Sequence, residues 1–302
     1  MTKHTSASTA PRLLGADLLF AAAGAVAFSG KAIIVKLAYR YGVDAITLLL
    51  YRMAFALPLF LVLSWRAGRG KPRLTLRDWR GLVALGLTGY FLSSIFDFAG
   101  LQYISANLER LILYQGPTLV LIFSVLFHGT RVSYRQWLAL AASYLAVVAA
   151  LGHDATHGDG NVALGAILVF ASAVSYSLYL VLSGVVVRRL GALRISGVAS
   201  SIACCLCIAL FFAMRPIHAL DVAPEVIWLS LLNATLCTFC PVLFVLLAVE
   251  RIGPALTAQT GMIGPLSTVV MSWLWLDEPI TIWIALGTLL VLAGIWLLAR
   301  WR

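Results

Sequence analysis

The stretch LGADLLFAAA (Leu14–Ala23) recurs 150 residues later in the chain as LGAILVFASA (Leu164–Ala173). The two copies agree at eight of ten positions when Ala22 and Ser172, which share one position, are counted as similar. Each copy opens a long apolar run. The recurrence therefore predicts that the second half of the chain repeats the first.

A second match extends the repeat toward its end. Gly116-Pro117 and Gly264-Pro265 lie 148 residues apart, each inside an apolar stretch. Three further pairs keep this register: Ile104 and Ile252, Leu108 and Leu256, Ser124 and Ser272. Overall identity in this part is low, so the first block and the Gly-Pro pair carry the argument for duplication.

Composition places both halves in a membrane. Only 11% of the residues are charged and the mean hydropathy is +0.96, whereas soluble domains carry roughly 25% charged residues. A net charge of +10 would suggest nucleic-acid binding in a soluble protein, but here the cations stand mostly between apolar runs, as membrane orientation requires. Nucleic acid is therefore not expected as a partner.

Ten apolar segments are each long enough to cross a hydrocarbon core of about 30 Å as helix. They are Gly15–Tyr39, Ala45–Trp65, Gly81–Leu101, Asn107–Phe127, Tyr134–Leu151, Val162–Val187, Ile195–Met214, Glu225–Val249, Pro254–Leu276 and Ile280–Ala299. The sequence thus predicts an all-α integral membrane protein of ten transmembrane helices. Residues 1–12 form an N-terminal tail, 13–152 the first five-helix repeat, 153–161 an external loop, and 162–302 the second repeat with a short C-terminus.

The positions of Lys and Arg outside these segments predict the orientation. Sixteen fall on one side, and only Arg40 and Arg215 on the other. By the positive-inside rule, both termini are expected in the cytoplasm and the protein in the plasma membrane. Because five is odd, the second repeat enters the membrane inverted relative to the first, an architecture common in transporters. The alternative is that duplication only builds a stable bundle.

Together these features resemble the drug/metabolite transporter superfamily, EamA type, over nearly the whole chain. The resemblance rests on the 5+5 spans, on Pro117 and Pro265, and on LWLDEPIT (Leu274–Thr281), similar to the family's acidic turn. The first repeat departs from it, with Thr130 where the second has Glu278; we interpret this turn as structural. The resemblance implies a secondary transporter that exports small metabolites such as amino acids, which in one branch of the family are aromatic.

Ionisable residues inside spans cost roughly 2.5–3.5 kcal/mol each on insertion scales, so each is a functional candidate. The candidates are Lys31, Lys36, Arg52, Asp97, Glu109 and Arg110, all in the external half of the bilayer. We expect Asp97 and Glu109 each to face a cation, and interpret Lys31, Arg52, Asp97 and Glu109 as ion-pair or coupling candidates. The alternative, which we favour for Lys36 and Glu109, is that they form structural pairs or reach the interface from a helix end. A proton carried by Asp97 or Glu109 is one hypothesis for the driving force; facilitated diffusion fits the sequence equally well.

Polar residues at helical spacing indicate faces that line a cavity. The cavity candidates are Tyr90, Ser94, Asp97, Asn107, Arg110, Tyr114, Tyr176, Tyr179, Asn233 and Gln259. The alternative is that such residues hold helices together by hydrogen bonds. We expect a small-molecule substrate and the lipid bilayer as partners, and function as a monomer.

Other classes of protein find little support. An intramembrane enzyme would need a catalytic motif, and neither H-E-x-x-H nor G-x-S-x-G occurs. All five cysteines lie in apolar segments, and we interpret Cys237-x-x-Cys240 as buried small side chains rather than a metal or redox site. No metal or cofactor is expected. A multidrug, nucleoside or sugar permease remains the alternative within transporters.

Overall fold

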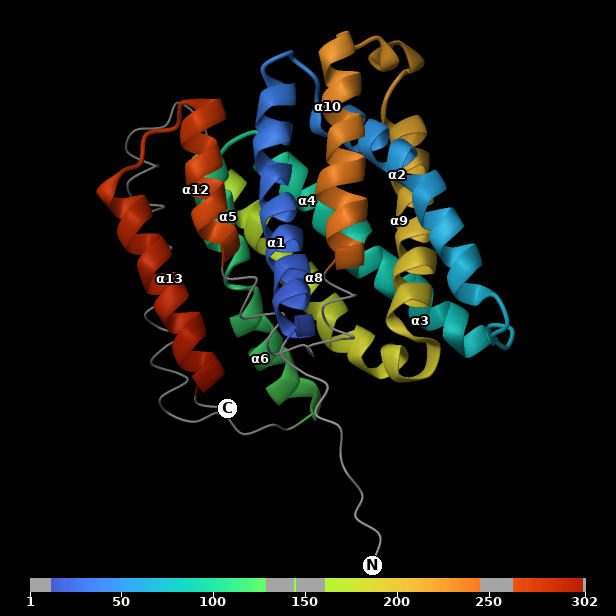
Figure 1. Ribbon diagram of the computed structural model, residues 1–302. Coiled ribbons are helices and arrows are strands. Elements are labelled where there is room, and N and C mark those ends of the chain that lie inside the picture. The colour runs from blue at the N-terminus through green and yellow to red at the C-terminus, as the bar shows by residue number, and fades with distance from the viewer. Residues whose placement is uncertain (1–11, 129–143, 145–160, 245–262, 301–302) are drawn as a thin grey trace, which may run out of the picture.

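The computed structural model describes residues 12–128, Tyr144, 161–244 and 263–300, and these are helices joined by short turns. In the first half the elements are α1 (Arg12–Tyr39), α2 (Ala45–Gly68), α3 (Leu76–Gly86), η1 (Leu87–Leu92), α4 (Ser93–Gly100), α5 (Ala106–Leu113) and α6 (Gly116–His128). In the second half they are α8 (Val162–Leu190), α9 (Ala192–Met214), η2 (Ile217–Leu220), α10 (Pro224–Ala234), η3 (Thr235–Phe239), α12 (Ile263–Leu276) and α13 (Ile282–Arg300). Figure 1 shows them side by side as one bundle.

Seven stretches within the described part of the chain are long and apolar enough to cross a membrane. They are Ala22–Tyr39, Ala45–Gly68, Leu76–Gly100, Ala106–Phe127, Val162–Ser183, Ala192–Met214 and Pro224–Phe244, and they coincide with seven of the ten predicted spans. The predicted span Tyr134–Leu151 falls outside the described residues except for Tyr144. Of Pro254–Leu276, only the part from Ile263 onward is described, as α12, and α13 occupies the position of the last span.

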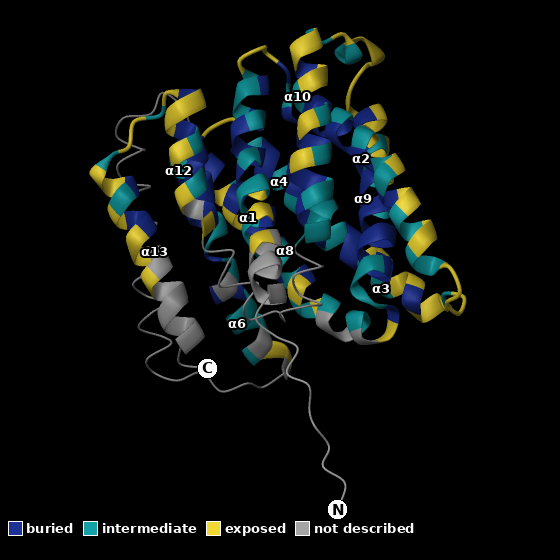
Figure 2. Ribbon diagram, in the orientation of Figure 1, coloured by how far each residue is buried: buried dark blue, intermediate teal, exposed yellow. Residues whose placement is uncertain are grey.

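The outer surface of the bundle is apolar. Trp228 on α10 is 66% exposed and Leu289 on α13 is 60% exposed, and Figure 2 shows exposed residues along the outward sides of both helices. A soluble monomer rarely exposes contiguous apolar surface on this scale. Lipid is therefore the medium that this surface fits.

Local chemistry sets the helix boundaries. The side chain of Asp44 accepts hydrogen bonds from the backbone N–H groups of Ile46 and Thr47 and so caps α2. Gly191, with φ of 80°, is the only residue between α8 and α9, and its left-handed backbone lets two long helices meet at a sharp turn. The predicted helix Asn107–Phe127 is divided into α5 and α6 just before Pro117, whose ring removes a backbone donor.

The third helix of each predicted repeat contains one π-helix. η1 lies between α3 and α4, and η3 follows α10. They begin at Leu87 and Thr235, 148 residues apart, which is the offset of Gly116 from Gly264. π-helices are rare and appear mostly at functional sites.

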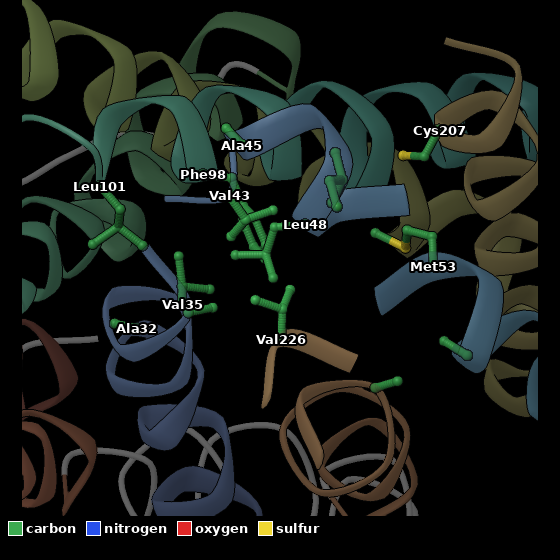
Figure 3. Packing of buried hydrophobic residues seen from close by; sticks show 14 of the residues in the cluster. Ala32, Val35, Val43, Ala45, Leu48, Met53, Phe98, Leu101, Cys207 and Val226 are labelled. Carbon is green, nitrogen blue, oxygen red and sulfur yellow. The ribbon is translucent and has the colours of Figure 1, made fainter. Parts of the chain in front are cut away.

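The two halves pack against each other in a reciprocal pattern. Helix α1 of the first half packs against α10, η3 and α12 of the second half. Helix α8 of the second half packs against α3, η1, α4, α5 and α6 of the first half. The helices α2 and α9, second in their halves, pack against each other. In the large core, the sulfur of Cys204 on α9 lies 3.7 Å from that of Met53 on α2, and Figure 3 shows Met53, Leu48 and Phe98 among the side chains of this core.

Contacts at the ends of α2 and α9 define the two ends of the bundle. An ion pair of 3.1 Å between Asp44 and Arg215 joins the start of α2 to the end of α9. At the other end, the guanidinium of Arg194 donates to the carbonyl of Pro72 at 2.9 Å. These are called the Asp44 end and the Pro72 end. α1 finishes at the Asp44 end and α8 at the Pro72 end, while the first turn of α1 and the last turn of α13 lie at the same end of the bundle (Figure 1).

Candidate substrate-binding site

Among the described residues, seven charged side chains are buried; Asp78 and Arg194 lie near the Pro72 end, and the other five lie inside the bundle. Lys31 on α1, Arg52 on α2, Asp97 on α4, and Glu109 and Arg110 on α5 are each at most 5% exposed. They are called the charge cluster. Sequence reasoning selected all five, from four helices, because charges at membrane depth are expensive.

Lys31 is the centre of the charge cluster. Its ammonium contacts Asp97 Oδ2 at 2.5 Å and Glu109 Oε1 at 3.2 Å. We expected each carboxylate to face a cation: both contact Lys31, and Arg110 Nε also stands 3.8 Å from Glu109 Oε2. Glu109 is fully buried, so it is not a helix-end residue that reaches the interface.

Arg110 and its neighbours connect the charge cluster to the second half of the chain. Arg110 Nη2 donates to the carbonyls of Phe28 and Ser29, both at 3.2 Å. The hydroxyl of Ser29 in turn donates to the carbonyl of Gly264 on α12 at 2.9 Å. The backbone of α1 is thereby held between α5 and α12.

Arg52 connects the charge cluster to the π-helix η3. Its Nε donates to Thr238 Oγ1 at 2.9 Å, and that hydroxyl donates to the carbonyl of Asn233 at 2.8 Å. The Asn233–Thr238 spacing of five residues belongs to the π turn. The guanidinium also lies 4.9 Å from the centre of the Phe98 ring, in cation–π contact.

Asn107 lies outside the charge cluster, at the Asp44 end. Glu278 accepts hydrogen bonds from the backbone N–H of Ala106 and from Asn107 Nδ2, both at 2.9 Å, and Ser272 donates to Asn107 Oδ1 at 2.8 Å. The carboxylate thus caps α5 and joins it to the turn between α12 and α13. This geometry agrees with the interpretation of the acidic turn as structural.

The predicted tyrosines form a second group. Tyr179 lies 5.4 Å from Tyr90 and 5.5 Å from Tyr176 between ring centres. They pack with Leu82 and Ile195 in a small apolar core. These three residues are called the tyrosine cluster.

The other cavity candidates are placed individually. Ser94 is buried on α4, one turn before Asp97, and Asn233 is buried at the end of α10. Tyr114 follows α5, where a Cβ atom on Gly264 would collide with its hydroxyl. Gln259 lies outside the described residues.

A cavity of about 530 Å³ opens at the Asp44 end. It is lined by Lys36, Tyr39, Arg40, Gly42, Val43, Asp44, Gln102, Leu276 and Glu278, and is called the vestibule. None of the nine predicted cavity residues that the structure describes lines it. Tyr39 connects it to the interior, because its hydroxyl donates to the carbonyl of Phe98 at 2.6 Å.

Several contacts of the charge cluster were not foreseen from the sequence. Thr238 and Phe98 both contact Arg52, and Ser29 contacts Arg110 through its carbonyl. Phe98 follows Asp97 directly, which was a usable signal. The sequence carried no signal for Thr238, because its position depends on a π turn that no residue pattern predicts. Among the described residues, no group of three potential ligands could hold a metal ion.

Comparison with known proteins agrees with these observations. The sequence profile of the EamA-like transporter family matches the chain twice, over residues 16–152 and 163–300. The uncharacterized transporter YcbK of Bacillus subtilis (strain 168) is 30% identical, over 88% of this chain and 87% of its own length. An uncharacterized transporter of Haemophilus influenzae (strain ATCC 51907 / DSM 11121 / KW20 / Rd) is 25% identical over 74% of this chain and 76% of its own.

A solved crystal structure has the same fold. It superposes with a TM-score of 0.61 at 19% identity and covers 95% of this chain and 98% of its own. The family's name and those of the relatives describe transport, and none of them describes catalysis. The chain is a multi-pass membrane transporter, and it belongs to the EamA-like transporter family.

Proposed function

We propose that this transporter exports small metabolites such as amino acids, aromatic ones included, by alternating access between two inverted five-helix repeats. It acts as a monomer in the plasma membrane with both termini in the cytoplasm. The Asp44 end then faces the external medium.

Four observations support the inverted 5+5 arrangement. The family profile matches twice, the π-helices share the 148-residue offset, and the packing of α1 is reciprocal to that of α8. In addition, α1 and α8 finish at opposite ends of the bundle (Figure 1). Such halves can exchange conformations around a site at their junction, which opens alternately to the two sides.

The observation that carries the function is the charge cluster itself. It is buried toward the Asp44 end of the bundle, and it meets the second half directly at Thr238 and, through Ser29, at Gly264. Five buried charges with few hydrogen bonds are a costly way to hold helices together. A polar group of the substrate that binds between the halves would offset the desolvation free energy of these charges.

Proton coupling at Asp97 or Glu109 is part of the proposal. One ammonium serves two carboxylates, so either acid can take up a proton while the other keeps Lys31. Protonation and substrate binding then compete for the same polar groups, which links their free energies.

A solute panel in proteoliposomes tests the transport function. Purified protein is reconstituted, and uptake of amino acids, nucleosides, sugars and cationic drugs is compared with that of empty liposomes. Amino acids are expected to be moved, with Asp97→Asn and Arg110→Ala reducing the rate at least tenfold. Arg189→Gln, at an exposed guanidinium, is the control and should keep the wild-type rate. Movement of nucleosides, sugars or drugs alone would replace the substrate class, and no movement of any solute would overturn the function.

An imposed pH gradient tests the coupling. Uptake of the transported solute should change several-fold when the gradient is applied, and the change should vanish in Asp97→Asn or in Glu109→Gln. Equal uptake with and without the gradient would identify facilitated diffusion and remove protons from the proposal.

A further inference from the structure

The charge cluster has one more cation than it has anions. Lys31, Arg52 and Arg110 oppose only Asp97 and Glu109 among its five members. Arginine keeps its proton in proteins, so it cannot lose its charge by deprotonation. A surplus buried cation in a membrane protein is expensive unless an anion joins it for part of the transport cycle.

Within the part of the chain that the structure describes, Arg52 is the member of the charge cluster without an ion pair to an acid. Lys31 contacts both carboxylates and Arg110 lies 3.8 Å from one of them, whereas Arg52 contacts a hydroxyl and an aromatic ring. Within the described residues, its Nη1 atom is fully buried and has no hydrogen-bond partner. A buried charged donor without an acceptor is a rare feature that calls for an explanation.

The surroundings of Arg52 indicate the shape of an acceptor. The Phe98 ring lies against the guanidinium and Thr238 fixes its Nε, so the charged plane is held in one orientation. The nearby core is apolar, with Met53, Cys204 and Cys207 among its members. A small anion with an apolar body fits this combination, because its charge pairs with the guanidinium and its body replaces lipid-like contacts.

We propose that Arg52 binds the carboxylate of the transported solute through Nη1, with Thr238 as its positioning residue. This inference rests on the proposed transport function and specifies its substrates as small amphipathic carboxylates. A role as interhelical glue alone does not need the charge, since a neutral amide at this position makes the same bond to Thr238 without the cost of burying a cation.

Matched acid–amide pairs test the assignment by binding. The melting temperature of the purified full-length protein is followed by tryptophan fluorescence while two pairs are titrated: phenylalanine with phenylalaninamide, and 3-phenylpropanoate with 3-phenylpropanamide. In the wild type, each acid should bind at least tenfold more tightly than its amide. Arg52→Gln should bring the two affinities of each pair within about twofold, and Arg52→Lys should fall between.

Controls separate this effect from a general loss of structure. Arg194→Gln removes another buried guanidinium, at the Pro72 end, and should keep the acid preference. The melting temperature of Arg52→Gln without ligand should be no lower than that of Arg194→Gln. A chloride titration is run in parallel, and an equal stabilisation by chloride would assign the site to an inorganic anion and overturn the carboxylate.

The remaining outcomes distinguish the two proposals. If Arg52→Gln keeps the acid preference, or if no acid stabilises the wild type, the Arg52 assignment is wrong, while solute movement in the liposomes still supports the transport function. If acid binding depends on Arg52 but no solute crosses the liposome membrane, the binding site stands and the transport function fails.

Discussion

The two stretches that match the family profile, residues 16–152 and 163–300, each contain a π-helix and a Gly-Pro pair at an offset of 148, yet all five members of the charge cluster belong to the first stretch. At the same offset, the positions that correspond to Arg52, Asp97, Glu109 and Arg110 hold Ser200, Val245, Thr257 and Ala258. The second stretch contacts the first through a hydroxyl and a carbonyl: Thr238 accepts from Arg52, and Gly264 accepts from Ser29. The two stretches therefore differ in where they hold buried charge, although the proposed duplication gives them one frame.

The largest expected difference between the halves is at Lys31. Lys31→Met leaves Asp97 and Glu109 buried without their ammonium, which should lower the free energy of unfolding by about 3–5 kcal/mol. Val181, 150 residues further on, is the matched position, and Val181→Met should change stability by less than about 1.5 kcal/mol. Melting temperature and yield of folded protein measure both.

The reason for the Lys31 effect is tested by a triple variant. Adding Asp97→Asn and Glu109→Gln to Lys31→Met removes the uncompensated charges and should recover most of the lost stability. Equal melting temperatures for Lys31→Met and Val181→Met would show that the halves do not differ as described.

A smaller difference is expected at the paired glycines. A Cβ on Gly264 would collide with the Tyr114 hydroxyl, whereas a Cβ on Gly116 meets only Ser177 Oγ at 3.8 Å. Gly264→Ala should therefore cost about 1–3 kcal/mol, and Gly116→Ala should be neutral or slightly stabilising. Tyr114→Phe should relieve part of the cost at Gly264. Similar thermal shifts for both alanine variants would contradict this account of the junction.

The acidic turn of the second half should contribute about 1 kcal/mol. Glu278→Gln weakens the cap on α5, because it removes a negative charge beside the N–H groups of Ala106 and Asn107. Asp277→Asn removes the neighbouring charge and is the control; asparagine tolerates the φ of 58° found there. Thermal unfolding should separate the two variants, and an equal loss would assign the effect to net charge.

The smallest effect is expected at Asp44, in the turn before α2. Burial alone would raise the pKa of its carboxyl, but hydrogen bonds from Thr47 and Ile46 and the charge of Arg215 outweigh it and hold the pKa below its ordinary value. The carboxylate therefore stabilises the fold above the unfolded-state pKa, and this contribution disappears as the pH falls through the lower folded-state pKa. At neutral pH it should be worth below about 1 kcal/mol, since the pair is partly exposed.

Asp44→Asn should accordingly lower the melting temperature slightly at pH 7 and flatten its decline below about pH 4. Asp221→Asn, in the turn between η2 and α10, is the comparison and should change the melting temperature less than Asp44→Asn does. Identical acid profiles for wild type and Asp44→Asn would remove this ion pair from the account.

Much of the fold follows from simple sequence patterns. Apolar length placed the described spans to within a few residues: α2, predicted over Ala45–Trp65, ends at Gly68. Prolines within spans are expected to kink or loosen their helices; α5 and α6 are separated just before Pro117, whereas α2 continues through Pro58. The π-helices were not predicted, since one extra residue in a turn leaves composition and hydropathy unchanged.

The sequence predicted which residues belong to the candidate site, but it did not predict how they are arranged. The cost of burying charge identified Lys31, Arg52 and Asp97 individually. Helical spacing put Tyr90 and Asp97 on one face, yet the π turn between Tyr90 and Ser94 changes the helical register, and Tyr90 belongs to the tyrosine cluster instead. Which acid meets which cation depends on packing between helices, and no single-helix pattern contains that information.

The charges that line the vestibule have a consequence for how ions would cross this opening. Its lining includes two cationic side chains, Lys36 and Arg40, and two acidic ones, Asp44 and Glu278. An opening with balanced charge has a weak long-range electrostatic potential, so it neither concentrates charged solutes nor repels them. Exchange across this opening should then be nearly insensitive to ionic strength, and the choice among solutes rests with the buried interior.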